Sequence, residues 1–349
     1  MLRYVNTAST AGGDGTTNAT SGANRAYASL AAWEAAEQAD LTSLTEIAEV
    51  RCCGTAADTT AVSVDGWTTS ASYYIWIRGN EGDAAGRHEG RWSTSHYRME
   101  VSIDGDVLRL EEAYTRVTGI QVYNTLALTG DWNPVGLIAP AASCVIDAVI
   151  ARGTPNAADY IRSGIAIGAN GIVRNSIAFD WRNTATNRGE GFARIGFTAQ
   201  AQNCTAYNCH AGYSTPDEGA SAAQQLIVRN CVAAGCASGF LAGWTFGTGS
   251  DYNASDDATP PGANSLSNVA DFDFADAAGF DFSLGASSPL IDEGTDLSSD
   301  FTTDIAGQTR TGTWDIGAWE YQSGGGGGRA MPLAGLGGGL VGSRRGLAR

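Results

Sequence analysis

The stretches "IVRNSIAFD" (172–180), "QNCTAYNC" (202–209) and "LIVRNCVAAGC" (226–236) decide the fold, because they are copies of one pattern. Superposing them aligns Asn175, Asn203 and Asn230, at spacings of 28 and 27 residues. Two earlier stretches, "VIAR" (149–152) and "QVYN" (121–124), extend the series backwards in steps of 28 residues. The alignment therefore indicates a repeat, and every residue in it has to be interpreted as one member of a column.

Each repeat unit carries two or three short, β-rich segments and no helical period. A unit of 27 to 28 residues is about the length of one coil of a right-handed parallel β-helix, whose coils bury their apolar edges only by stacking. We therefore predict an all-β protein built as a single right-handed parallel β-helix.

Composition supports this fold and excludes some functions. The 349 residues include 46 glycines, and only 17% of the chain is charged, which suits tight turns and stacked sheets. The net charge of −16 argues against a nucleic-acid partner, because phosphate contacts need clustered cations. No window has 18 consecutive apolar residues, so we expect no membrane span, and the N-terminus lacks the pattern of a secretory signal peptide.

Four regions are expected along the chain. Residues 1–45 form an N-terminal strand, a loop and a capping helix, the helix being predicted over 26–41. Residues 46–250 form the coils, 251–322 a closing segment, and 323–349 a Gly-rich tail.

The closing segment carries "SPLIDEGT" (288–295), "TDIAGQTR" (303–310) and "DIGAWEY" (315–321). These motifs resemble the end of right-handed β-helix surface proteins called choice-of-anchor Q domains. The opening "RYVNTASTAGGDG" (3–15) resembles the start of the wider pectate-lyase-like superfamily. The resemblance covers residues 3 to 322 and implies the β-helix fold, while the fold itself hosts lyases, hydrolases, adhesins and phage spikes.

The asparagine column is predicted to be a structural ladder in which each side-chain amide bonds to the next. Two cysteine columns accompany it: Cys204 with Cys231, and Cys209 with Cys236. Their spacing fits no common zinc site, so buried thiols are favoured over metal ligands. A Cys204–Cys231 disulfide stays open for an oxidising setting.

Catalytic residues are not assigned. Polygalacturonase-type β-helices use paired Asp motifs and a Gly-His-Gly, whereas Asp256–Asp257 lies in a Pro/Ser loop and the histidines (His88, His96, His210) are not so flanked. Arg174 and Arg229 recur beside the ladder and are interpreted as a solvated strand face. Asp292, Asp304 and Asp315 are expected to tie loops through backbone bonds or an Arg310 pair. No cofactor is predicted, although Ca²⁺ at these carboxylates is conceivable.

Tryptophans near coil corners are the remaining candidates, either as stacking surfaces for a glycan or as covers for an outer face or a protomer interface. They are Trp76, Trp92, Trp132, Trp181 and Trp244.

The tail is predicted to dock onto a partner through its apolar and basic residues. These are Arg329, Met331, Leu333, Leu336, Leu340, Arg344 and Arg345.

The favoured hypothesis is a structural or adhesive virion protein: a phage tail fibre, spike or capsid decoration. It would bind other virion proteins through the tail, form a homotrimer that protects strand edges, and contact a surface glycan. The alternatives are a β-helix polysaccharide lyase or glycoside hydrolase, and a bacterial cell-surface adhesin.

Overall fold

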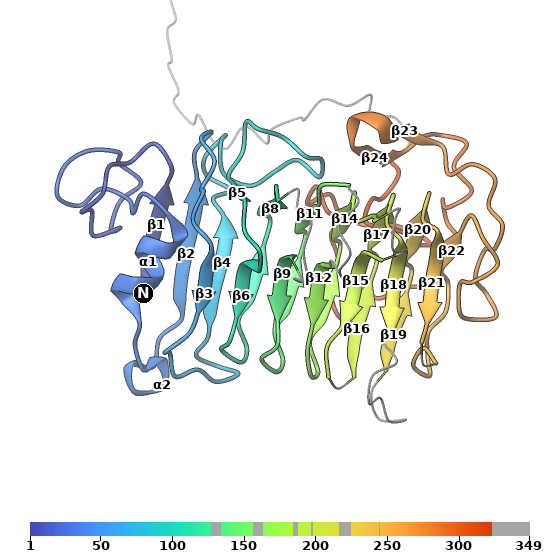
Figure 1. Cartoon of the computed structure of the whole chain (residues 1–349), viewed down its shortest axis with the longest axis horizontal. Helices are drawn as coiled ribbons and strands as arrows, with labels where there is room; N and C mark the ends of the chain where they lie inside the picture. Colours follow the sequence, from blue (N-terminus) through green and yellow to red (C-terminus); the bar gives the residue numbers. More distant parts are fainter. Residues whose placement is uncertain are drawn as a thin grey trace, which may run out of the picture.

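The computed structural model of the chain describes residues 1–126, 134–155, 163–183, 188–196, 198–215, 225–243 and 245–322. The chain folds as a single right-handed parallel β-helix, as predicted, and its coils stack along the long axis in Figure 1. Three parallel sheets form the walls of the helix in the described part of the chain, and a separate two-stranded hairpin lies outside them.

Sheet 1 has eight strands, whose bounds are β1 Leu2–Asn6, β2 Ala48–Cys53, β4 Ile75–Gly79, β7 Arg116–Thr118, β10 Val145–Asp147, β13 Ile172–Arg174, β16 Ala199–Gln202 and β19 Leu226–Arg229. Sheet 2 consists of β5 Arg98–Val101, β8 Gln121–Asn124, β11 Ile150–Arg152, β14 Ile177–Phe179, β17 Thr205–Tyr207, β20 Val232–Ala234 and β22 Ala254–Ser255. Sheet 3 consists of β3 Val62–Val64, β6 Asp106–Leu110, β9 Val135–Ala139, β12 Ser163–Ile167, β15 Glu190–Arg194, β18 Ala211–Thr215 and β21 Ser238–Ala242.

The register of the strands confirms the repeat. In sheet 1, Ile172 pairs with Gln200 and Gln200 with Ile227, at the predicted intervals of 28 and 27 residues. The earlier copies were misaligned by one residue: Ile177 pairs with Ile150, not with Val149. Since side chains alternate between the two faces of a strand, that slip would have exchanged inward and outward residues there.

Left-handed residues turn the chain at its corners. Between sheets 1 and 2 the turning residues are Gly119, Ala148, Asn175, Asn203 and Asn230, all with positive φ. Between sheets 2 and 3, Asp180, Asn208 and Gly235 do the same. Asn, Asp and Gly tolerate this conformation better than other residues do. The asparagine column therefore has a backbone reason as well as a side-chain one.

The N-terminal end is closed by two short helices rather than the single predicted helix over 26–41. Helix α1 (Leu30–Glu37) begins after Ser29, whose hydroxyl accepts the Ala32 N–H, and α2 (Leu41–Leu44) begins after Asp40. Asp40 has an extended backbone between the two helices and begins α2, because its carboxylate accepts the Thr42 and Ser43 N–H groups. Trp33 of α1 is buried and stacks on Trp67, which covers the first coil.

The interior of the coils is apolar and ends in an aromatic stack. Phe192, Tyr213 and Phe240 occupy paired positions of β15, β18 and β21, with ring centroids 5.0 and 4.8 Å apart. Parallel pairing in register places these equivalent rings face to face.

The exposed strand edges at both ends are covered by the chain itself. At the C-terminal end, the Gly239 N–H donates to Asp257 and the Phe240 N–H donates to Thr259. At the N-terminal end, the Asn6 N–H of β1 donates to the Tyr27 carbonyl. Edge protection therefore does not require the predicted homotrimer, whose existence remains a prediction.

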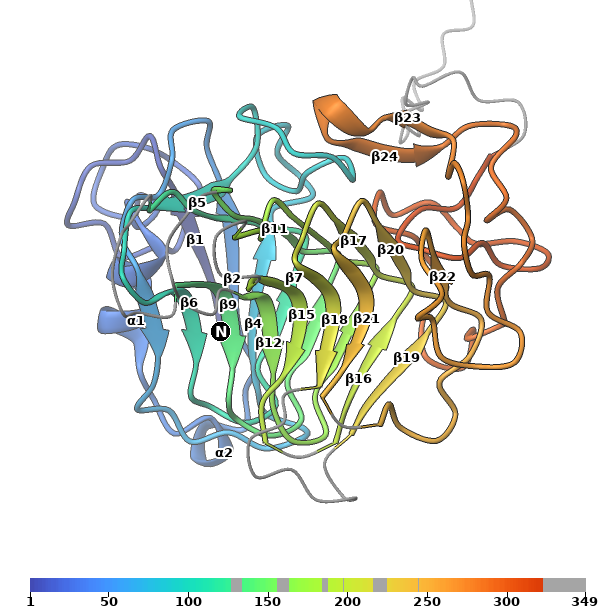
Figure 2. The same ribbon diagram turned by 45° about the vertical axis from the view of Figure 1, so that its right-hand side comes forward.

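The closing segment (251–322) runs back along the outside of the coils, as Figure 2 shows in orange to red. It contains β23 (Phe274–Asp276), the 3-10 turn η1 (Ala277–Gly279) and β24 (Asp281–Leu284). Its apolar residues cover the outer face of sheet 2: Phe272, Leu290 and Ile316 pack near Val232 and Ala234. Further along, Arg87 donates to the Ile305 carbonyl, so the segment reaches back to the loop before β5. The segment is a lateral strap as well as an end cap.

Candidate functional site

The asparagine column is a ladder in only one of its two steps. The Asn230 amide donates to the Asn203 side-chain oxygen at 3.0 Å. The Asn203 amide instead donates to the carbonyls of Asp315 and Gly317, and the Asn175 amide donates to Asp147. The expectation that each asparagine bonds to the next is therefore wrong between Asn203 and Asn175. The closing segment supplies the partners there, because it lies on this corner.

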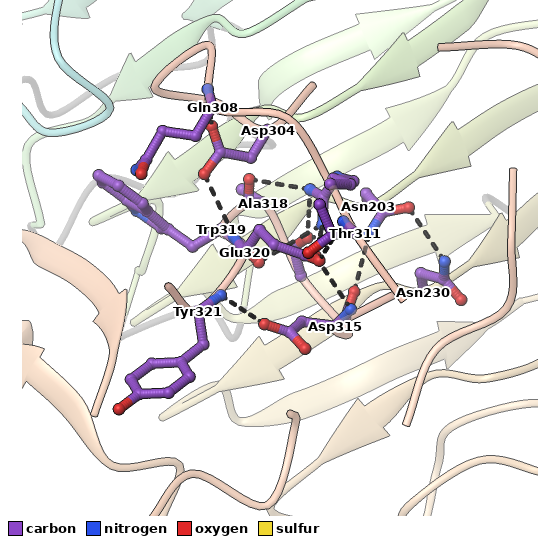
Figure 3. Close-up of polar contacts among 12 residues, drawn as sticks. Asn203, Asn230, Asp304, Gln308, Thr311, Asp315, Ala318, Trp319, Glu320 and Tyr321 are labelled. Atoms are coloured by element: carbon purple, nitrogen blue, oxygen red, sulfur yellow. Dashed lines mark hydrogen bonds and ion pairs between the residues drawn. The ribbon is translucent and has the colours of Figure 1, made fainter. Parts of the chain in front are cut away.

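A buried ion pair anchors the closing segment to the same corner (Figure 3). Arg310 and Glu320 are both buried and lie 3.1 Å apart. The second terminal nitrogen of Arg310 donates to the Asn175 side-chain oxygen and to the carbonyls of Gly317 and Ala318. A buried charge is tolerated when it is paired and hydrogen-bonded in this way.

Two aspartates of the closing motif complete the network. Asp304 accepts the N–H groups of Gln308 and Glu320, and Asp315 accepts those of Asp292 and Tyr321. Burial raises the pKa of both, that of Asp315 to about 6. The expected role of these carboxylates in tying loops is what the contacts show.

A cleft of about 360 Å³ lies between this strap and the coils. Its walls include Glu81, Arg87 and Asp147 from the coils, and Asp304 and Gly307 from the closing segment. The carboxylates there already have partners: Glu81 pairs with Arg78, and Asp147 with Arg174. The described residues contain no group of three or more His, Cys, Asp or Glu side chains that could hold a metal ion.

The cysteines are free thiols at consecutive coil levels. Cys204, Cys231 and Cys209 are fully buried, and Cys236 is half-buried. Burial raises the pKa of Cys204 and Cys209 well above that of an exposed thiol. A thiol protonated at neutral pH is a poor nucleophile and a poor metal ligand.

The buried histidine also serves the fold. His88 lies within hydrogen-bonding distance (2.7 Å) of the Ala148 carbonyl and accepts the Gly90 N–H. Burial lowers its pKa to about 3, which leaves the ring neutral. His88 therefore supports the corner at Ala148 and offers no proton at physiological pH.

The five predicted tryptophans separate into three groups. Trp181 is buried inside the coils, where its indole N–H donates to the Ala151 carbonyl, so its assignment as an exposed aromatic is wrong. Small residues make room for this ring: a Cβ atom on Gly153 or Gly164 would lie within 2.8 Å of it.

Trp132 and Trp244 lie outside the described residues, as does the whole predicted docking tail, 323–349. Trp76 and Trp92 are half-buried on outer faces.

Trp76 belongs to an aromatic and cationic patch on the outer face of sheet 1, which we call the sheet 1 patch (Tyr74, Trp76, Arg78 and Arg116). The guanidinium of Arg116 lies 3.8 Å from the centre of the Tyr74 ring, and that of Arg78 lies 4.3 Å from the Trp76 ring. Arg116 pairs in register with Trp76 and is exposed. Arg78 is paired with Glu81 and Glu49, whereas the described residues give Arg116 no carboxylate partner.

Trp92 lies over the outer face of sheet 2, beside Tyr123 and Phe179, with ring centroids 5.6 and 6.4 Å away. Arg152 sits among these rings. Arg116 and Arg152 were not singled out in the sequence. Each lies at one end of a three-residue strand, and the local sequence gives no signal that separates them from Arg174 or Arg229.

On sheet 3 the chain places a carboxyl group between hydroxyl groups. The Ser163 hydroxyl donates to Glu190 at 2.7 Å, and Ser163 pairs in register with Glu190. Burial raises the pKa of Glu190. A general acid needs a carboxyl group that stays protonated at higher pH.

Comparisons with known proteins assign the chain to no family. No family model matches the chain, and no curated protein matches it. Among solved structures, "Crystal structure of pectate lyase Pel9A" is similar over 92% of this chain and 96% of that chain, with 15% identity and a TM-score of 0.39. The architecture rests on the strand pairing of the chain itself. No helix in the described residues is long and apolar enough to cross a membrane.

Proposed function

We propose that this protein is a structural, adhesive β-helix that binds a surface glycan through the sheet 1 patch. The observation that carries the proposal is the exposed Arg116, stacked on Tyr74 and paired in register with Trp76. Sugar rings stack on aromatic side chains, and a guanidinium with unused donors binds hydroxyl or carboxylate oxygens. A strip of such groups on a flat parallel sheet suits an extended chain of sugars.

The buried polar contacts of the strap support a role in presenting a binding surface. Arg310, Glu320 and the corner asparagines hold the strap against the coils over a long sequence separation, since Arg310 bonds to Asn175. A solenoid clamped along its side is a stiff support for a binding face. This stiffness favours a virion component such as a tail fibre, spike or capsid decoration, with a bacterial surface adhesin as the other setting. Finding the gene among capsid and tail genes would separate the two.

The binding test uses the full chain and a panel of neutral and acidic bacterial polysaccharides, with affinity measured by calorimetry or affinity electrophoresis. Trp76→Ala and Arg116→Gln are each expected to weaken binding about tenfold or more, because each removes a contact worth about 1 to 3 kcal/mol. Gln200→Ala, on the same outer face, is the matched control and should leave binding unchanged.

Binding that survives both substitutions would place the glycan elsewhere on the surface. If no polysaccharide in the panel binds the unaltered protein, the adhesive proposal fails, whatever the variants do. Melting curves of each variant would show that the coils remain folded.

A second function, a polysaccharide lyase or glycoside hydrolase, is favoured by Glu190 alone. The pKa of Glu190 is raised, and its carboxyl group accepts a hydrogen bond from Ser163. Such a carboxyl group could exchange protons with a substrate. Release of oligosaccharides or unsaturated products from the same panel, with and without Ca²⁺, tests this function. Activity lost in Glu190→Gln and retained in Glu100→Gln would establish it, and no release under any condition would remove it.

A further inference from the structure

An arginine sits in a column of aromatic residues on the outer face of sheet 2. The pairing of β8, β11 and β14 places Arg152 directly between Tyr123 and Phe179. The next strand, β17, continues the column with Tyr207. A cation at this position interrupts an otherwise aromatic row, and the row would pack as well with an apolar residue there.

The guanidinium of Arg152 is surrounded by four rings from separate parts of the chain. Its central carbon lies 4.6 Å from the ring centre of Phe280, 4.7 Å from Tyr123, 5.5 Å from Trp92 and 5.8 Å from Phe179. The rings also contact each other, with Phe280 stacked on Phe179 at 4.6 Å. We call this group the Arg152 cage. Cation–π contacts hold the guanidinium in place while leaving its hydrogen-bond donors unused.

The cage includes a residue in an unfavourable backbone conformation. Phe280 has φ of 64°, a left-handed value that a bulky side chain rarely adopts. The turn η1 holds it there, because the Phe280 N–H donates to the Ala277 carbonyl and Asp276 caps the turn. Strain of this kind is commonly retained at functional positions. Here it places the Phe280 ring over Arg152.

The donors of Arg152 are the unexplained feature. Its Nε atom is shielded from solvent and has no hydrogen-bond partner, and no carboxylate of the described residues forms an ion pair with it. The nearby Asp180 carboxylate interacts electrostatically with Arg152 but forms no ion pair with it, and it accepts a hydrogen bond from the Asn208 amide. A buried donor on a charged group costs free energy when it is left unpaired. The Nε atom of Arg310 is also buried and unpaired, but a carboxylate and four other oxygen atoms accept hydrogen bonds from the terminal nitrogens of Arg310. The terminal nitrogens of Arg152 have no such acceptor among the described residues.

We propose that the Arg152 cage binds a carboxylate-bearing sugar, with the carboxylate on the guanidinium and the apolar face of the ring against Trp92 or Tyr123. A planar guanidinium matches a carboxylate with two parallel hydrogen bonds, and half-buried aromatic rings bind the C–H face of a pyranose. This inference rests on the proposed glycan-binding function and adds a second binding site, which selects negatively charged sugars. Its site lies on sheet 2, separate from the sheet 1 patch.

The experiment measures binding of methyl glucuronide and methyl galacturonide to the full chain by ligand-observed NMR and calorimetry. The corresponding uncharged methyl glucoside and galactoside are the matched ligands, and a sulfated monosaccharide reports whether any anion suffices. The charged sugars are expected to bind at least about tenfold more tightly than the uncharged ones, because a charge-assisted bidentate contact is lost in the latter. Arg152→Gln should remove that preference, and Arg152→Lys should keep only part of it.

Arg91→Gln is the control substitution, since Arg91 is a neighbouring surface arginine that pairs with Asp281. Equal binding of charged and uncharged sugars, or unchanged uronide binding in Arg152→Gln, would overturn the cage proposal. Equal binding of the sulfated sugar would replace carboxylate recognition by general anion binding. If Arg152→Gln does not fold, the ligand comparison on the unaltered protein and the variant Trp92→Leu decide the question.

The two proposals fail separately. Loss of polysaccharide binding in Trp76→Ala, together with no uronide preference at Arg152, would leave the adhesive function and remove the cage. The opposite result would leave the cage as the binding site and remove the sheet 1 patch. Absence of all binding would remove both.

Discussion

Two arginines on the outside of the same coils show opposite use of a charged side chain. Arg310 of the closing segment is buried at the corner of sheets 1 and 2, where Glu320, the Asn175 oxygen and two carbonyls accept its hydrogen bonds. Arg152 lies on sheet 2 among four aromatic rings, and its terminal nitrogens have no hydrogen-bond acceptor among the described residues. The Nε atom is buried and unpaired in both arginines. An arginine whose terminal nitrogens are bonded to protein oxygens holds the fold together. One whose donors are unused is available to a ligand.

The largest expected effect is that of Arg310→Met. The substitution leaves Glu320 and Asp304 buried without their cation, and breaking a buried pair in this way costs about 3 to 5 kcal/mol. We expect release of the strap, seen as rapid proteolysis within 287–322 and a lower unfolding midpoint in denaturant. The double variant Arg310→Met, Glu320→Leu should recover part of the loss. A melting curve like that of the unaltered protein would show that the network contributes little.

A smaller loss is expected for Asn203→Ala. The Asp315 and Gly317 carbonyls and the Asn230 amide would each lose a partner, and alanine tolerates the positive φ of this corner less well than asparagine. We expect a loss of about 1 to 3 kcal/mol in the free energy of unfolding. Gln200→Ala, three residues earlier on the exposed face, is the control, and similar losses at both positions would argue against a special role for the corner.

The strap should hold more tightly in mild acid. The pKa of Asp315 is raised from an ordinary value of 3.8 to about 6 in the folded protein, chiefly by burial. The folded state therefore binds the proton more tightly than the unfolded state. This contribution to stability is fully present below about 4 and is lost as the pH rises through about 6. The buried Asp304 shifts in the same direction.

Asp315 should slow proteolysis of the closing segment at pH 5 relative to pH 7.5, whereas the buried His88, whose pKa is lowered to about 3, acts in the opposite direction over this range. Comparison of the unaltered protein with Asp315→Asn isolates the Asp315 contribution, because the amide does not titrate and His88 is the same in both. If the variant keeps the same pH dependence, other groups are responsible.

The smallest effect on stability is expected at Arg152→Gln. The cation–π contacts of a half-exposed arginine contribute about 0.5 to 1 kcal/mol, so the melting temperature should fall only slightly. A loss as large as that of Arg310→Met would mean that the cage is a structural clamp, and the difference between the two arginines would disappear.

The sequence predicted the stacking of the coils more accurately than it predicted the corner residues and the position of the strap. The asparagine repeat predicted the register between Ile172, Gln200 and Ile227, and the structure has that register. The same reasoning misplaced Val149 by one residue, because the short "VIAR" segment has no asparagine to mark its corner. Ala148 takes the left-handed conformation there, which composition does not reveal.

The candidate sites depend on contacts that no local pattern contains. Trp181 was expected at the surface, and its burial follows from Gly153 and Gly164, which leave space for the ring on neighbouring coils. Cys204 and Cys231 were expected as stacked thiols and are placed at equivalent levels inside the coils, with no disulfide between them. Spacing alone could not decide between these states, since it does not report the direction in which a side chain points.

By itself the sequence determined the repeat length, and with it the stacked parallel coils, because a column of equivalent residues can align only if each copy makes one turn. It also identified the closing segment (251–322), whose motif carries several aspartates and Arg310. Only the tertiary structure decided where that motif lies, because Arg310 meets Asn175 across 135 residues. The same is true of Arg310 and Arg152. Strand pairing and the position of the strap, which depend on residues far apart in the sequence, decide that the fold uses the Arg310 guanidinium and leaves that of Arg152 for a ligand.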